Sequence, residues 1–421
     1  MRRLFILLII IFIVQQTYGQ SFKVVAYLPD YRFSILTKID YAKTTHVIAA
    51  FANPDSSGVL SFSQNINTFV TNVHNGGAKA MVSLGGGGDY SWGNSYHTYE
   101  YLFRSAADRT NFVVSIMNYV RAHHLDGIDL DLEGNALQLS NYNIFSQELA
   151  DSLHLLDLTI SGAYVSGSWA PYVSNQTLQK LDFITTQSYG GVGDWNWNNP
   201  SDQAPFSMFK SDIDFWKTRG LTASKILGGL PFYVVQFPIT ESSTPPPAYW
   251  PYEPTLCSIY ESAALAPQEP LKYDLVYTDD GNGDPIYLNS LPTFKKKIQY
   301  AAANAGGIMI WEIGSDCYDG TLNVLDTLAT YISQNVLSIE TKTLSSDLKF
   351  YPNPANGFIK LEGQYQSITS YIISDMYGRT VMRAVLTDPI IDVSNVESGM
   401  YLFSITKEDN SQYTTKLLIQ R

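Results

Sequence analysis

The chain has 421 residues, of which 45% are hydrophobic, and a formal net charge of −12. This length and composition can bury a full hydrophobic core, which excludes a disordered tail and leaves room for one large domain with a small one, or two of medium size. Lysine and arginine are neither abundant nor clustered, so the charge argues against a nucleic-acid partner and favours a neutral or amine-bearing substrate.

The first residues predict a signal for export. Met1-Arg2-Arg3 is basic, residues 4–14 are unbroken apolar sequence, and small residues follow at Thr17 and Gly19. The apolar run is too short to span a bilayer, which needs about 20 residues. We therefore expect a signal peptide at residues 1–19 that is cleaved near Gly19, and a secreted or cell-surface protein with no membrane segment after cleavage.

From residue 20 to residue 336, short apolar runs alternate with longer amphipathic stretches. This is the βα rhythm of a parallel sheet, and its eight repeats are the number that closes a (β/α)8 barrel. The candidate strands are Val24–Leu28, Val47–Phe51, Ala80–Leu84, Gly127–Glu133, Leu156–Gly162, Phe183–Tyr189, Ile226–Phe232 and Gly307–Ile313. An open doubly wound sheet is the alternative, but the first strand runs into Pro29-Asp30-Tyr31 and not into a glycine-rich phosphate loop.

The segment 126–134 reads Asp-Gly-Ile-Asp-Leu-Asp-Leu-Glu-Gly. Successive side chains of a strand point to opposite faces, so Asp129, Asp131 and Glu133 share one face and the aliphatic residues share the other. An exposed edge strand would also alternate in this way, but the flanking barrel pattern favours acids that line the interior. Asp126 has the wrong parity for that face and is expected to support the turn into the strand.

Like charges crowded where solvent is scarce cannot all ionise, so at least one of these acids should hold a proton near neutral pH. A protonated carboxyl of this kind can serve as a general acid. Glu133 is the outermost and longest of the three and is the candidate acid. Asp131 lies deeper and is placed to contact the substrate, and Asp129 shares charge or a proton with Asp131.

The same segment resembles the D-G-x-D-x-D-x-E signature of the family 18 glycoside hydrolases, the chitinases and their relatives. Three further segments are similar to motifs of that family, namely Ser83–Gly87, Gln187-Ser188-Tyr189 and Gly306–Glu312. The resemblance implies a retaining mechanism in which the substrate's own 2-acetamido group attacks the anomeric carbon. Chitin or another N-acetylglucosamine-containing glycan is then the expected substrate, with no cofactor and no metal.

The resemblance also implies roles for individual residues. Glu133 would protonate the leaving oxygen and later activate water, Asp131 would orient the acetamido N–H, and Asp129 would tune Asp131. Tyr189 would donate to the acetamide oxygen, and Trp311 would form the floor of the sugar subsite. The remaining expected substrate contacts are Tyr27, Phe51, Gly86, Gln187, Trp195 and Trp92.

Substrate choice is less constrained than reaction type. Gly190 stands where the family often has Asp or Asn, and Gln187 replaces the commoner Met, as in subgroups that include plant-type chitinases and endo-acting N-glycan hydrolases. An endo-β-N-acetylglucosaminidase and a silent chitin-binding lectin are therefore the alternatives to a chitinase. The presence of Glu133 argues against the lectin, since lectin-like relatives typically lose that residue.

Two regions lie outside the barrel rhythm. Residues 238–292 are rich in proline, tyrosine and turn residues and predict an insertion after the seventh strand, on the functional face. After a polar linker at residues 337–346, period-two strands at residues 347–421 predict a small all-β sandwich. This module resembles the sorting domains of the bacterial type IX secretion system, so the secretion machinery is an expected partner. A carbohydrate-binding sandwich is the alternative, although the module has no tryptophan with which to stack on sugars.

The sequence offers no ligand spacing typical of a metal site. His123 and His124 lack an H-E-x-x-H pattern, and the calcium-like spacing from Asp280 to Asp284 lacks the glycine and glutamate of a binding loop, so it is interpreted as a hairpin turn. The only cysteines, Cys257 and Cys317, either pair after export or remain as buried thiols.

Overall fold

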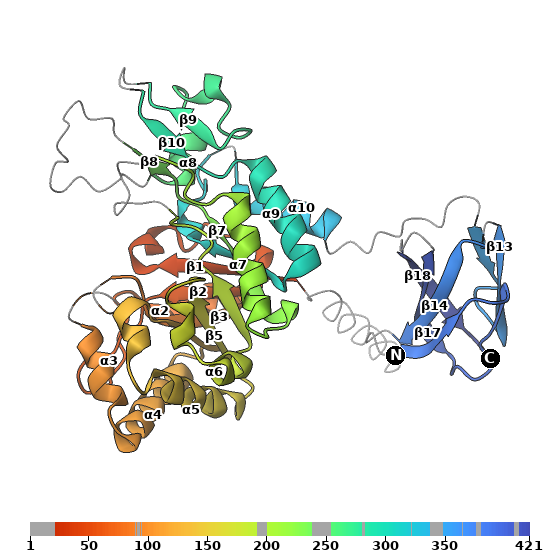
Figure 1. Ribbon diagram of the computed structural model, residues 1–421, viewed down its shortest axis with the longest axis horizontal. Helices are drawn as coiled ribbons and strands as arrows, with labels where there is room; N and C mark the ends of the chain where they lie inside the picture. The colour runs from red at the N-terminus through yellow and green to blue at the C-terminus, as the bar shows by residue number, and fades with distance from the viewer. Residues whose placement is uncertain are drawn as a thin grey trace, which may run out of the picture. The chain divides into compact units, whose positions relative to one another are not determined.

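The computed structural model describes residues 22–336 and 348–421, apart from 89, 91–92, 94, 192–199, 238–253, 280–282, 321, 364, 376–379 and 408–411. The chain divides into two compact units, one up to Ile332 and one from Ser333 (Figure 1). Among the described residues, no helix combines the length and the apolar character that crossing a membrane requires.

The first unit contains a closed barrel of eight parallel strands, as predicted. Its strands are β1 Lys23–Pro29, β2 His46–Ala50, β3 Lys79–Gly85, β4 Gly127–Asp131, β5 Thr159–Tyr164, β6 Phe183–Thr186, β7 Ile226–Pro231 and β11 Gly307–Trp311. They pair in the order β1-β11-β7-β6-β5-β4-β3-β2, so β1 closes the barrel by pairing with both β2 and β11. Parallel pairing places every carboxyl end at one mouth of the barrel.

The strand limits differ from the sequence prediction at several ends. The fifth strand begins at Thr159, because Leu156 belongs to the turn after the preceding helix and is 43% exposed. Five strands also stop early: β2 and β7 end one residue short, and Glu133, Tyr189 and Ile313 lie beyond β4, β6 and β11. Polar and aromatic residues at the barrel mouth leave the hydrogen-bonded ladder and enter loops, which period-two alternation does not reveal.

Helices surround the barrel strands (Figure 1). The α-helices of this unit are α2 Ile66–Asn75, α3 Tyr96–Phe103, α4 Ala106–Ala122, α5 Tyr142–His154, α6 Asn175–Lys180, α7 Phe206–Thr218, α8 Leu256–Tyr260, α9 Leu291–Asn304 and α10 Val324–Asn335. Short 3-10 turns are η2 Asp30–Ile35, η3 Tyr41–Lys43, η4 Gly134–Gln138, η5 Ala170–Tyr172, η7 Ala223–Lys225, η8 Ala266–Gln268 and η9 Ile313–Ser315. In α4, Ser105 caps the first turn, and Phe112, Ile116 and Val120 lie on the buried face.

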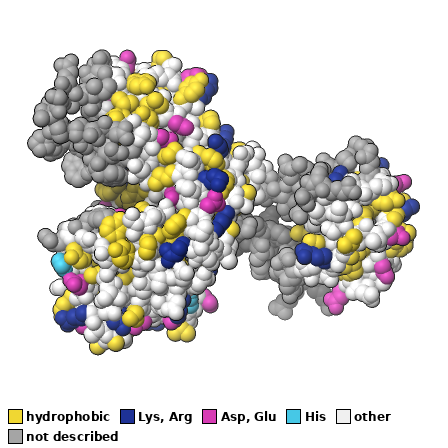
Figure 2. All heavy atoms as spheres, in the orientation of Figure 1, with side chains coloured by type: hydrophobic (Ala, Val, Ile, Leu, Met, Phe, Trp, Pro, Cys, Tyr) yellow, Lys and Arg dark blue, Asp and Glu magenta, His cyan; other side chains and the backbone are white. Residues whose placement is uncertain are grey.

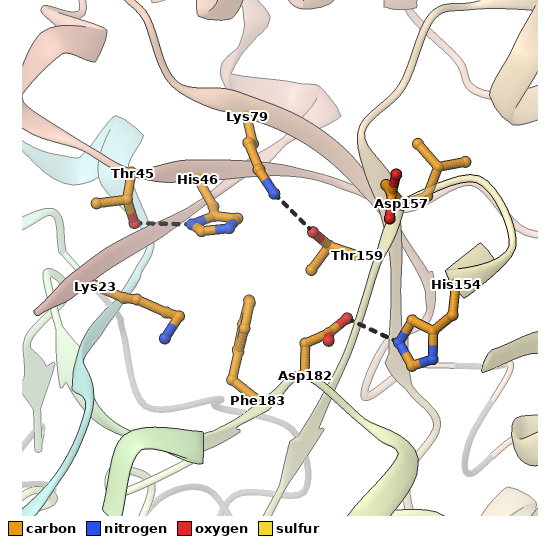
Figure 3. Close-up of a pocket in the computed structure, with 10 residues that line it drawn as sticks. Lys23, Thr45, His46, Lys79, His154, Asp157, Thr159, Asp182 and Phe183 are labelled. Carbon is orange, nitrogen blue, oxygen red and sulfur yellow. Dashed lines mark hydrogen bonds and ion pairs between the residues drawn. The ribbon is translucent and has the colours of Figure 1, made fainter. Parts of the chain in front are cut away.

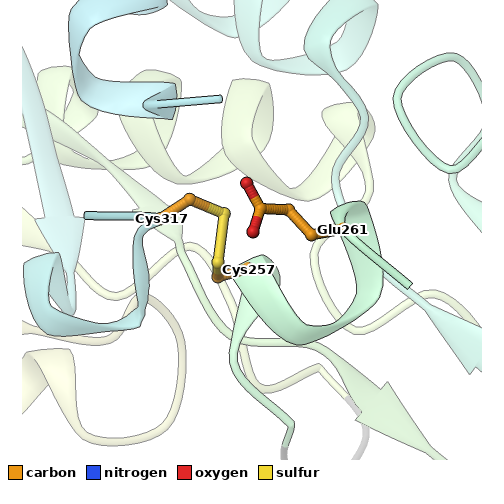
Figure 4. A group of neighbouring side chains, drawn as sticks. All are labelled: Cys257, Glu261 and Cys317. Atoms are coloured by element: carbon orange, nitrogen blue, oxygen red, sulfur yellow. A yellow bond between two sulfur atoms is a disulfide. The ribbon is translucent and has the colours of Figure 1, made fainter. Parts of the chain in front are cut away.

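The insertion after β7 carries a small antiparallel sheet in the order β8-β10-β9. Its strands are β8 Val235–Gln236, β9 Leu275–Tyr277 and β10 Pro285–Tyr287, and β9 and β10 form the predicted hairpin. Cys257 and Cys317 form a disulfide that ties α8 to the segment after η9 (Figure 4). Glu261 lies beside it. The bonded sulfurs are not thiolates, so this cluster is not a metal site in the oxidised protein.

The second unit packs two antiparallel sheets on one core, as predicted for a small sandwich. One sheet has the order β12-β13-β16 and the other β15-β14-β17-β18. The strands are β12 Leu348–Tyr351, β13 Phe358–Gly363, β14 Ile368–Asp375, β15 Thr380–Val385, β16 Ile390–Asp392, β17 Gly399–Lys407 and β18 Gln412–Ile419. Ile359, Ile373, Phe403 and Leu417 are among its buried core residues. On the face shown in Figure 2, acidic and basic side chains are interspersed among neutral ones.

Candidate active site

Asp129 lies in the barrel interior, fully buried on β4. Its register partners on the neighbouring strands are Ser83 of β3 and Ser161 of β5. Both serine hydroxyls donate to its carboxylate, at 2.7 Å and 2.6 Å, and the Tyr27 hydroxyl of β1 donates at 2.8 Å. Burial raises the pKa of Asp129, and the three hydroxyl donors oppose that rise because they favour the charged form.

Asp131 lies one layer nearer the carboxyl-terminal mouth and is 3% exposed. Burial raises its pKa well above the usual range, and the charges of Glu133 and Asp129 and a hydrogen bond with Glu133 act in the same direction. Glu133 follows the end of β4, is half-buried, and precedes η4. Burial and the neighbouring carboxylates thus all favour the protonated form of Asp131.

Gln187 joins the two outer acids. Its side-chain amide donates to Asp131 at 3.0 Å and to Glu133 at 2.7 Å. One amide group thus holds both carboxyls on the same side of the barrel mouth. The sequence predicted Gln187 as a substrate contact, but its bonds to Asp131 and Glu133 depend on the end of β6 lying one strand away from β4 in the closed barrel.

The glycine run after β3 passes close to the acids. The Gly86 amide donates to the Asp131 carbonyl at 2.7 Å, and the backbone of Gly86 has a φ of +95°. A Cβ at Gly86 would lie 2.7 Å from the Phe51 ring, and one at Gly87 would lie 3.1 Å from the Glu133 carboxylate. Glycine is therefore required at Gly86 both for its backbone conformation and for this close approach.

Aromatic side chains cover the interior beside the acids. The Trp311 ring lies 5.5 Å from Tyr27 and 6.1 Å from Phe51, centroid to centroid. Trp311 and Phe51 are half-buried, whereas Tyr27 is only 1% exposed. Tyr27, which was predicted to contact the substrate, has a buried ring, and its hydroxyl donates to Asp129. It supports the acids from within the barrel.

Tyr189 follows β6 and packs edge-on against Tyr233, at 6.1 Å between centroids. Burial raises the pKa of its hydroxyl well above the usual range, so the group keeps its proton. In the described structure this hydroxyl donates to the Met309 sulfur at 3.9 Å, which is a weak acceptor. A carbonyl oxygen of a ligand would be a stronger acceptor for the same proton.

Asp126 takes the structural position that its parity predicted. Its carboxylate accepts from the Ala80 amide and from the His74 ring, both at 2.7 Å, at the start of β4. Trp92 and Trp195, two of the predicted substrate contacts, lie outside the described residues. Ser161 was missed by sequence reasoning, because only its register with Asp129 distinguishes it from other serines.

Two family models match the chain. The model for glycosyl hydrolases family 18 matches residues 23–316, which is more than half of the chain. The chain belongs to glycosyl hydrolase family 18. It is therefore a glycoside hydrolase, and residues 126–133 lie within the matched range. A secretion system C-terminal sorting domain matches residues 349–420, which implies that this family 18 enzyme is exported.

Several known proteins are similar to the family 18 chain. Mouse chitotriosidase-1 is 23% identical over 412 residues, which are 84% of this chain and 86% of the mouse protein. Probable chitinase 10 of Drosophila melanogaster is 26% identical over 232 residues, which are 48% of this chain and 10% of the fly protein. Among solved structures, the chitinase ChiB of Flavobacterium johnsoniae is 28% identical with a TM-score of 0.65, covering 75% of this chain and 94% of ChiB.

Proposed function

We propose that the chain is an exported chitinase that hydrolyses β-1,4-linked N-acetylglucosamine polymers with retention of configuration. The proposal rests on the grouping of Asp131 and Glu133 under one amide, that of Gln187. Carboxyls that also hydrogen-bond to one another lie on the same side of a bound sugar. They cannot act as an acid and a nucleophile on opposite faces of it, which needs about 5 Å between them.

The nucleophile is then the acetamido oxygen of the substrate itself. Glu133 donates a proton to the leaving glycosidic oxygen and afterwards takes one from the attacking water. Asp131 accepts a hydrogen bond from the acetamido N–H, and Tyr189 donates to the acetamido oxygen, so that the group is aimed at the anomeric carbon. Trp311 stacks under the reacting sugar. Relatives whose names describe chitinases, including ChiB, support this choice of substrate.

Glu133→Gln tests the assignment of the acid. This variant keeps the shape of the side chain but cannot deliver a proton, so kcat/KM on chitohexaose should fall by about 10²- to 10⁴-fold. Glu100→Gln is the matched control, because Glu100 is exposed on α3 and pairs with His97. Near-normal turnover by Glu133→Gln would contradict the assignment.

The anomeric form of the first product tests the mechanism. NMR of fresh chitohexaose digests should show the β-anomer, and an N-deacetylated hexamer should not be cleaved. An inverted product, or cleavage without acetamido groups, would refute substrate assistance. Parallel assays on chitin and on a glycoprotein separate a chitinase from an endo-β-N-acetylglucosaminidase, which remains the second candidate because Gln187 occupies the position it has in such relatives.

We further propose that residues 1–19 are removed on export, that residues 20–336 form the catalytic domain, and that residues 337–346 link it to the sorting domain at 347–421. The match to a sorting domain supports the last of these limits. N-terminal sequencing of protein recovered outside the producing cells should begin near Gln20. Recovery of an intact N-terminus from the medium would refute cleavage.

A further inference from the structure

A cavity of about 590 Å³ lies at the amino-terminal end of the barrel (Figure 3). Five barrel strands begin at its lining, with Lys23, His46, Lys79, Thr159 and Phe183 as their first residues. Because the strands are parallel, this end is opposite the mouth that carries the acids of β4. The cavity is therefore separate from the proposed sugar site, and its size is within the range of small-molecule pockets.

The floor of the cavity is aromatic and uncharged. His46 is 8% exposed and Phe183 is 1% exposed, and their rings meet edge-on at 5.3 Å. Burial lowers the pKa of His46 to about 3, and the charges of Lys79 and Lys23 act in the same direction. The imidazole is therefore neutral at ordinary pH, and its Nδ1 is paired with the Thr45 hydroxyl at 2.8 Å.

Two ammonium groups face the cavity above this floor. Lys79 donates to the Thr159 hydroxyl at 3.2 Å, and Lys23 donates to the Ser224 carbonyl at 3.4 Å. Neither lysine forms an ion pair with any residue that the structure describes. Burial lowers the pKa of Lys23, Asp182 opposes this, and Lys79 lowers it further. Both ammonium groups thus line one cavity, and the attraction of Lys23 to Asp182 is larger than its repulsion from Lys79.

The acidic groups of the cavity lie on its other side, at the rim. Asp182 accepts from the Ile160 amide at 2.8 Å and from the His154 ring at 3.2 Å, and Figure 3 shows its carboxylate turned toward His154. Asp157 is exposed beyond it. The cavity therefore has a basic side, formed by the starts of β1 and β3, and an acidic rim near β5 and β6.

We propose that this cavity is a second ligand site, which binds a small molecule through a phosphate or carboxylate group held between Lys23 and Lys79. An oxyanion at that position accepts charge-assisted hydrogen bonds from both ammonium groups. The Thr159 hydroxyl is a further donor, and the edge of the His46 ring lies at the floor for the organic part of the ligand.

Isothermal titration calorimetry at fixed ionic strength tests the site, with inorganic phosphate and citrate as probes and chloride as the balancing ion. We expect saturable binding of one anion per chain. Lys79→Met and Lys23→Met should each weaken it by at least about tenfold, because each removes one charge-assisted bond. Lys79→Arg keeps the charge and should keep the anion binding. Loss of binding in Lys79→Met can then be assigned to the lost charge and not to misfolding.

Lys38→Met is the matched control. It also removes one positive charge, but Lys38 pairs with Asp319 at exposed positions away from the cavity. Saturable binding of phosphate, of citrate or of both supports the site and identifies the preferred group. Binding of neither probe, or equal weakening by Lys38→Met, would overturn the proposal. Turnover of chitohexaose by Lys79→Met should equal that of the unmodified enzyme, so the outcome is independent of the proposed catalysis.

Discussion

The hydroxyl of Tyr27 provides a test of how the barrel holds a buried charge. Tyr27→Phe removes one of the three hydroxyl donors to Asp129 and keeps the ring that packs against Trp311. A hydrogen bond to a charged group contributes about 1.5–3 kcal/mol, whereas a bond between neutral groups contributes about 0.5–1.5 kcal/mol. The free energy of unfolding should therefore fall by about 1.5–3 kcal/mol if the Asp129 carboxylate is ionised.

A double-mutant cycle with Asp129→Asn measures this difference. In the Asn background only a neutral bond is lost, so Tyr27→Phe should cost about 1 kcal/mol less there. Urea denaturation at pH 7 gives all four free energies, and equal slopes would show that the extent of unfolding is unchanged. A coupling energy near zero would mean that Asp129 carries a proton, and would refute the view that these hydroxyls hold its charge.

Three further predictions follow from buried groups. Asp131→Asn should abolish most activity, yet its gain in free energy of unfolding over the unmodified protein should be larger at pH 8 than at pH 4. The reason is that the raised pKa of Asp131 makes its ionisation in the folded protein unfavourable above the unfolded value. Urea curves of both proteins at the two pH values would show no such difference if that pKa is normal. Cys257→Ser should cost about 4 kcal/mol by loop entropy for a separation of 60 residues, and thermal melts of the variant should not respond to reductant, whereas those of the unmodified protein should. Burial lowers the pKa of Lys297 to about 7, so the folded protein releases that proton while the unfolded chain keeps it to about 10.5. The stability of the unmodified protein relative to Lys297→Met should therefore rise from pH 7 to pH 10, and a flat difference would contradict the shift.

Much of the barrel could be predicted because its determinants are local. Alternation along residues 127–133 assigned the acids to one face, since the period of two along a strand is set by the local backbone conformation. The sequence limits of the strands were less accurate at Leu156 and Tyr189. Whether the first or last residue of an apolar run stays in the sheet depends on the neighbouring strand.

The surroundings of the acids are a property of the closed barrel. The bond from Tyr27 to Asp129 joins residues 102 positions apart, and the bond from Gln187 to Asp131 joins residues 56 positions apart. Likewise, the pairing of Cys257 with Cys317 was left open by their spacing and is settled by the meeting of α8 with the segment after η9.

The sequence by itself thus determined the strands, the shared face of Asp129, Asp131 and Glu133, and the chemistry that crowded carboxyls allow. Only the tertiary structure decided which hydroxyls and amides meet those carboxyls, that Tyr27 is buried beneath them, and that Lys23 and Lys79 face one cavity. The physical reason is that side-chain direction along a strand follows from its own backbone, whereas a contact across the barrel depends on the register in which separate strands pair.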